Sequence, residues 1–164
     1  MFNFTFTDEQ RAELINWSAE LRTTNKPQVI ETLRAPITED IQGSCGYCCL
    51  GIYLDMKRPE GWIFDPDNYW VYIKSDEDTQ YDTALPEEDS EKLGLLQSVT
   101  VRNKHNGNDY RRSLSLEELL VSLNDDSMYT FPQIADEIMS LIQTGNFTDQ
   151  GLEDLEWEPI YAKV

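Results

Sequence analysis

The sequence predicts a single compact α+β domain over residues 1–164, with several helices packed on a small antiparallel sheet. Helix start signals appear twice, each a hydroxyl residue followed three positions later by a glutamine or glutamate. Between them lie two segments rich in aromatic and β-branched residues, and an Asn-Gly pair that is typical of a hairpin. A chain of this length can bury roughly 70% of the surface that its unfolded form exposes, so one domain needs no disulfide to fold.

The N-terminal third is expected to hold three helices. The first begins after Thr7, because Thr7 and Gln10 have the spacing of a capping box, and it ends before Pro27. A second, short helix is expected to begin at Pro27 and to end before Pro36. Residues 48–56 are apolar around nearly the whole helical circumference, which is typical of a central buried helix.

The middle of the chain carries the strand signals. Aromatic and β-branched residues predict two strands on either side of an Asp-Pro-Asp-Asn turn, at residues 62–64 and 69–73. An acidic loop follows, and Pro86 suits the first turn of a short helix. Asn106-Gly107 predicts a hairpin over residues 99–113, because both central residues of a type I′ turn need positive φ.

Two further helices and a docked tail complete the expected fold. Ser115 and Glu118 form a second capping box. Thr130 is expected to cap the last long helix, and Gly145 is expected to end it. The acidic segment 146–164 contains enough apolar residues to dock on the domain as a strand or turn.

Charge is the most unusual property of the composition. Asp and Glu total 31 against 13 Lys and Arg, which gives a formal net charge of −18. The acids lie mainly in two blocks, residues 57–97 and 114–164, with a basic insert between them. Such a chain repels nucleic-acid phosphates and anionic lipids and attracts basic proteins, so we expect no direct nucleic-acid binding and no membrane binding.

We expect a cytoplasmic protein with reduced thiols. No apolar run approaches the roughly 20 residues of a membrane span. The first residues lack the basic and apolar segments of a secretion signal. The three cysteines are an odd number, which argues against a disulfide framework.

Residues 42–48 resemble the nucleophile segment of papain-type cysteine proteases. The resemblance implies that Gln42 would stabilise the oxyanion and that Cys48 would attack, but this chemistry also needs a histidine to take up the thiol proton. The single histidine, His105, lies at the predicted hairpin tip and lacks the small and apolar neighbours of that family's catalytic histidine. The alternative is that the cysteines are buried core residues and that the protein is not an enzyme.

No metal or cofactor is expected. Three cysteines within residues 45–49 and one distant histidine do not match the paired spacing of zinc motifs. The carboxylate clusters lack the glycine-turned loop and closing glutamate of a calcium site. No glycine-rich phosphate loop is present.

A second resemblance extends over most of the chain. The sequence resembles a group of small accessory proteins of bacteriophages and prophages, which share a series of short motifs in one order. In this chain the motifs are Trp17, Tyr-Cys-Cys-Leu-Gly at 47–51, Leu-Pro at 85–86, Leu-Gly-Leu at 93–95, Leu-Asn-Asp at 123–125, Phe131 and Ile-Ala-Asp at 134–136. The resemblance implies a phage protein in the cytoplasm of an infected bacterium, and it implies no catalytic residue.

Charge and resemblance together favour a phage accessory protein that acts without catalysis, by binding a host protein with a basic surface. If the acidic faces imitate DNA, which presents one charge per about 1.7 Å, the host protein is a nucleic-acid-binding protein and the chain an anti-defence inhibitor. An acidic surface that only confers solubility is the alternative. The candidate binding residues are Asp76, Glu77, Asp78, Asp82, Glu87, Glu88, Asp89, Asp149, Glu153, Asp154, Glu156 and Glu158.

A small-ligand or nucleotide-binding module is a further alternative. Its ligand would lie between the aromatic strands and the basic hairpin, where aromatic rings stack on bases and guanidinium groups pair with anions. The residues for this role are Trp62, Trp70, Tyr72, Arg111 and Arg112. Aromatic residues in strands more often belong to the core.

Overall fold

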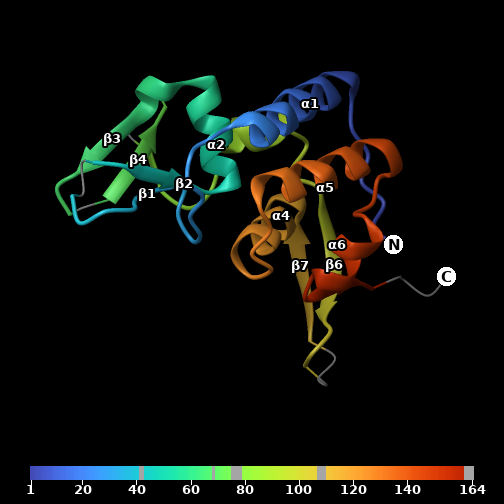
Figure 1. Cartoon of the computed structure of the whole chain (residues 1–164). Helices are drawn as coiled ribbons and strands as arrows, with labels where there is room; N and C mark the ends of the chain where they lie inside the picture. Colours follow the sequence, from blue (N-terminus) through green and yellow to red (C-terminus); the bar gives the residue numbers. More distant parts are fainter. Residues whose placement is uncertain (41–42, 68, 75–78, 107–109, 161–164) are drawn as a thin grey trace.

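The computed structural model describes residues 1–40, 43–67, 69–74, 79–106 and 110–160, and it confirms the α+β class. The strands form three small antiparallel sheets rather than one. In Figure 1 the sheets of β1 to β4 lie on one side of the molecule, and β6 and β7 lie with α4, α5 and α6 on the other. Helix α2 lies between the two sides, and α1 packs across α5.

Helix α1 spans Asp8–Thr23 and begins at the predicted capping box. Thr7 Oγ1 accepts from the Gln10 amide at 3.1 Å, and Gln10 Oε1 accepts from the Thr7 amide at 3.0 Å. Trp17, on the buried face, donates from Nε1 to the carbonyl of Cys49 at 3.0 Å. This bond joins α1 to the start of α2.

Helix α2 spans Cys49–Lys57 and is buried from Cys49 to Leu54, so the prediction of a central buried helix is confirmed. Gly51 lies where α2 touches the preceding chain. A Cβ atom at Gly51 would lie 1.9 Å from the carbonyl oxygen of Leu33, so only glycine permits this approach.

The short helix predicted from Pro27 is wrong. Gln28 instead forms a parallel bridge with Tyr47, and β1 (Arg34–Pro36) pairs with β2 (Cys45–Tyr47). The Tyr47 amide donates to the carbonyl of Pro27 at 2.9 Å, and the Val29 amide donates to the carbonyl of Tyr47 at 3.0 Å. Because a distant strand satisfies these backbone groups, the local helical preference of the segment is overridden.

The second sheet contains the predicted aromatic strands. β3 (Trp62–Asp65) follows the short 3₁₀ helix η1 (Pro59–Gly61), β4 (Tyr69–Ile73) pairs with it, and β5 (Gln80–Tyr81) completes the sheet. Arg34 of β1 joins the first two sheets, since its guanidinium lies 3.7 Å from the ring centroid of Trp70. Tyr47 and Trp62 pack edge to face at 5.8 Å beside it.

The third sheet is built from the predicted hairpin and the C-terminal segment. β6 (Ser98–Asn103) follows α3 (Glu87–Lys92) and pairs with β7 (Arg111–Ser115), which confirms the hairpin, although residues 107–109 lie outside the described residues. β8 (Trp157–Pro159) pairs with the other edge of β6. Residues 146–160 are therefore docked on the rest of the chain.

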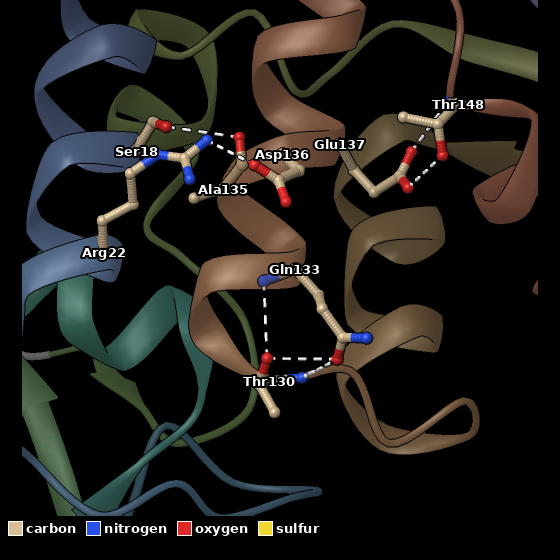
Figure 2. A network of polar contacts seen from close by, with 8 residues as sticks. All are labelled: Ser18, Arg22, Thr130, Gln133, Ala135, Asp136, Glu137 and Thr148. Carbon is tan, nitrogen blue, oxygen red and sulfur yellow. Dashed lines mark hydrogen bonds and ion pairs between the residues drawn. The ribbon is translucent and has the colours of Figure 1, made fainter.

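Helices α4 (Leu116–Asp125), α5 (Phe131–Thr144) and α6 (Asp149–Asp154) surround this sheet. Both capped starts are confirmed, and Gly145 ends α5 in the left-handed conformation with φ of 72°. Figure 2 shows the polar contacts of α5: Ser18 Oγ donates to the carbonyl of Ala135, and Arg22 pairs with Asp136.

Figure 2 also shows a buried carboxylate at the start of α6. Glu137 accepts from the amide of Thr148 at 2.8 Å and from its hydroxyl at 2.5 Å. Thr148 in turn caps α6, accepting from the Gly151 amide at 3.0 Å. Glu137 therefore holds α6 against α5.

Candidate functional site

The basic hairpin pairs with acidic groups of the same chain. Arg102 forms an ion pair with Glu158, and Arg112 lies 3.3 Å from Glu118. The ammonium group of Lys104 donates to the carbonyl oxygens that end α6, including that of Glu153 at 3.0 Å. These contacts dock the hairpin on the C-terminal acidic segment, so its positive charge is partly compensated within the chain.

The first set of candidate binding residues is only partly free. Asp76, Glu77 and Asp78 lie outside the described residues. Glu88 is shared by Lys74 and by Lys92, which lies at 2.9 Å.

Three other members of that set differ in exposure. Asp89 is buried at the start of α3, and burial raises its pKa. Asp82 and Glu87 are exposed.

The second set is also divided. Asp154 accepts from the hydroxyl of Tyr129 at 2.6 Å, and this bond lowers the pKa of Asp154. Asp149 and Glu153 are exposed on α6. Glu156 is exposed and lies beside a groove.

This groove of about 320 Å³ is the largest feature that combines the two acidic sets. It is formed by α4, the end of β7, the chain just before Leu85 and the chain around β8. It is lined by Thr83, Ala84, Arg112, Leu114, Glu117, Glu118, Val121, Ser122, Asp125, Asp126, Glu156 and Trp157. We call it the acidic groove, since five carboxylates and one guanidinium surround three large apolar side chains.

Arg112 and Glu117 are the two charged groups of the acidic groove most engaged within the fold. Arg112 lies 5.9 Å from the ring centroid of Trp157 and also pairs with Glu118. Glu117 accepts from the Leu85 amide at 3.1 Å and from the Ser90 hydroxyl. Burial raises the pKa of Glu117, and the two hydrogen bonds oppose that rise.

Two exposed carboxylates of the acidic groove remain available to a partner. Asp126 and Glu156 have no side-chain hydrogen bond or ion pair among the described residues. Asp126 ends α4, where the negative end of the helix dipole disfavours a carboxylate. A cationic group from a partner would relieve this local excess of negative charge.

Ser122 lines the same groove and is 7% exposed. Its hydroxyl oxygen is buried and has no hydrogen-bond partner among the described residues. A buried hydroxyl without a partner costs stability, so such groups are rare in folded proteins. The acidic groove therefore contains an unused polar group beside its carboxylates.

A smaller pocket of about 100 Å³ adjoins the acidic groove, and we call it the side pocket. Three residues, Thr83, Val121 and Asp125, line both. The side pocket is completed by Glu31, Thr32, Cys48, Cys49 and Asn124. Thr32 Oγ1 is a second buried hydroxyl oxygen without a partner among the described residues.

The structure does not bring together the residues of the cysteine-protease hypothesis. Cys48 is 5% exposed and caps α2, its Sγ accepting from the Gly51 amide at 3.5 Å. His105 is exposed in the loop after β6, and Figure 1 places that loop at the far end of the molecule from α2. Gln42 lies outside the described residues. The neighbouring Cys48 thiol and complete burial raise the pKa of Cys49.

The residues of the nucleotide hypothesis are divided between two sheets. Trp62, Trp70 and Tyr72 belong to β3 and β4, whereas Arg111 and Arg112 belong to β7. Arg34 is the cation that lies on the aromatic rings instead. Sequence reasoning missed Arg34, because only the pairing of β1 with β2 brings it there.

Neither a metal site nor a membrane span is found in the described part of the chain. No group of three or more His, Cys, Asp or Glu side chains there is arranged to hold a metal ion. None of the helices there is both long enough and apolar enough to cross a bilayer. No protein-family model, curated protein or solved structure matches the chain.

Proposed function

We propose that this protein acts without catalysis, by binding a basic segment of another protein in the acidic groove. The observation that carries the proposal is the composition of the groove: five carboxylates and one guanidinium around Leu114, Val121 and Trp157. Carboxylates would pair with Lys or Arg of the partner, and the apolar side chains would pack against its apolar residues. A segment that is both basic and apolar matches both properties.

The two kinds of contact contribute differently. Charge complementarity accelerates association and excludes acidic partners, but exposed ion pairs add only about 0.2–1 kcal/mol each. Burial of apolar surface on Trp157 and its neighbours supplies most of the affinity, at about 25 cal/mol per Å² before the costs of association. Binding should therefore weaken with salt without being lost.

The resemblance to phage accessory proteins extends the proposal to a bacterial host protein as the partner. A nucleic-acid-binding protein suits the charge, since its basic surface normally meets phosphates. The chain would then inhibit it by competing with DNA or RNA, as an anti-defence protein does. Compensation of Glu88, Asp154 and Glu158 within the fold supports a groove, rather than the whole acidic face, as the binding element.

Site-specific photo-crosslinking in bacterial lysate tests the proposal. The photoreactive residue p-benzoylphenylalanine replaces Ala84, which is exposed and lines the acidic groove, or Gln143, which is exposed on α5. The expected result is one crosslinked basic protein for the Ala84 variant that is lost at high salt and is not seen with the Gln143 variant. Crosslinks of equal pattern from both positions would contradict the proposal.

A further inference from the structure

The side pocket opens from the acidic groove and is narrow. Thr83, Val121 and Asp125 line both spaces, so a side chain that leaves a segment bound in the groove can enter the side pocket. Its volume of about 100 Å³ corresponds to roughly three water molecules. That space fits the last three heavy atoms of a lysine side chain, whereas the planar guanidinium of arginine is larger.

The polar atoms of the side pocket with spare capacity are hydrogen-bond acceptors. Asn124 is already satisfied: Oδ1 accepts from Gln28 and from the Cys49 amide, and Nδ2 donates to Val29 and Asp125. Asp125 accepts that one bond at 2.7 Å and has no ion pair among the described residues.

Two more oxygen groups add to this capacity. Thr32 Oγ1 is buried without a partner in the described part of the chain. Glu31, held in the left-handed conformation with φ of 68°, lines the same pocket with an exposed carboxylate. An ammonium group, with three donors and no acceptor, suits oxygen acceptors arranged in this way.

The remaining walls suit an alkyl chain. Val121 contributes an apolar side chain, and the buried thiols of Cys48 and Cys49 behave as small apolar groups. Lysine commonly buries its methylene groups along apolar surface while its ammonium group finds polar partners. The side pocket offers that combination at the length of one lysine side chain.

From this arrangement we infer that the side pocket binds one lysine side chain of the partner segment, with Asp125 and Thr32 as partners of its ammonium group. The inference rests on the proposed function, and it names the residue that anchors the segment. It also gives the groove a direction of discrimination: lysine enters the pocket, and arginine does not.

The test uses n-butylammonium chloride, which has the shape and charge of a lysine side chain, in a ¹H–¹⁵N NMR titration of the full chain. We expect saturable shifts at the amides of Thr32 and Asp125. Equal concentrations of 1-butanol or sodium chloride should not cause them, and n-butylguanidinium chloride should bind several-fold more weakly. Shifts that are absent, or that are equal for the ammonium and the alcohol, would overturn the inference.

Two variants separate the role of the pocket from a general loss of structure. Thr32→Val keeps the side-chain volume and removes the hydroxyl, and it should weaken n-butylammonium binding about fivefold. Thr100→Val, at an exposed strand position of β6, should leave it unchanged. Equal affinities for Thr32→Val and Thr100→Val would overturn the inference.

Failure of the inference is distinguishable from failure of the proposed function. If n-butylammonium does not bind while the Ala84 crosslink persists, the lysine anchor is wrong and the groove remains the binding element. If n-butylammonium binds at Thr32 and Asp125 but no groove-dependent crosslink forms, the side pocket recognises an amine and the proposed function is wrong.

Discussion

Removal of the Ser122 hydroxyl should stabilise the protein. Ser122 lies in α4, and its hydroxyl oxygen is buried without a partner among the described residues. Replacement by alanine removes a desolvated polar group that costs at least about 1 kcal/mol. Alanine also gains roughly 0.5 kcal/mol of helix propensity over serine. We therefore expect Ser122→Ala to raise the free energy of unfolding by about 1.5 kcal/mol and the Tm by about 4 °C.

Ser18→Ala provides the matched control. Ser18 is also a buried helical serine, but its hydroxyl donates to the carbonyl of Ala135 at 3.3 Å. The loss of that bond, about 1 kcal/mol, outweighs the gain in helix propensity, so this variant should lose about 0.5 kcal/mol. Urea unfolding followed by circular dichroism measures both values. If Ser122→Ala is destabilised as much as Ser18→Ala, the Ser122 hydroxyl has a partner and the acidic groove holds no polar group reserved for a ligand.

The remaining predictions concern the fold around α2. Gly51→Ala would place a Cβ atom 1.9 Å from the carbonyl oxygen of Leu33, so it should cost at least about 3 kcal/mol in urea unfolding; a loss below 1 kcal/mol would contradict this contact. Burial raises the pKa of Tyr53, so the folded state favours its neutral form, and the free energy of unfolding should fall as pH rises above 10. Tyr53→Phe should reduce that fall, and an unchanged pH dependence would refute the assignment. Under native conditions a maleimide should label Cys45, which is half-buried, well before the other two thiols, and simultaneous labelling of all three would contradict their burial.

Local signals in the sequence predicted the elements that they control. Both capping boxes form as their spacing indicates, and Gly145 ends α5 with positive φ. In each case the residues that interact lie within four positions, so the backbone geometry follows from the residue types alone. Pro27 is the counterexample, because its segment is held by hydrogen bonds to Tyr47, which the local pattern does not contain.

The acidic groove could not be predicted in the same way. Charge patterning identified Glu156 as a candidate, but it also selected Glu88 and Glu158, whose charges are paired within the fold. The groove appears only when α4 and the chain around β8 come together, and Trp157 meets Arg112 through the pairing of β6 with both neighbours. Contacts between residues this far apart in the chain leave no periodic pattern.

The acidic groove as the binding element is tested most directly by the dissociation constant of the crosslinked partner for two double variants. Asp126→Asn with Glu156→Gln removes two exposed groove carboxylates, and Glu9→Gln with Glu91→Gln removes two exposed carboxylates elsewhere. At about 50 mM salt we expect the groove variant to bind about fivefold more weakly and the control to bind as the parent does. The difference should shrink at about 300 mM salt, where screening is stronger. Equal weakening by both variants would show that the partner senses only the net charge, and the groove would not be its binding site.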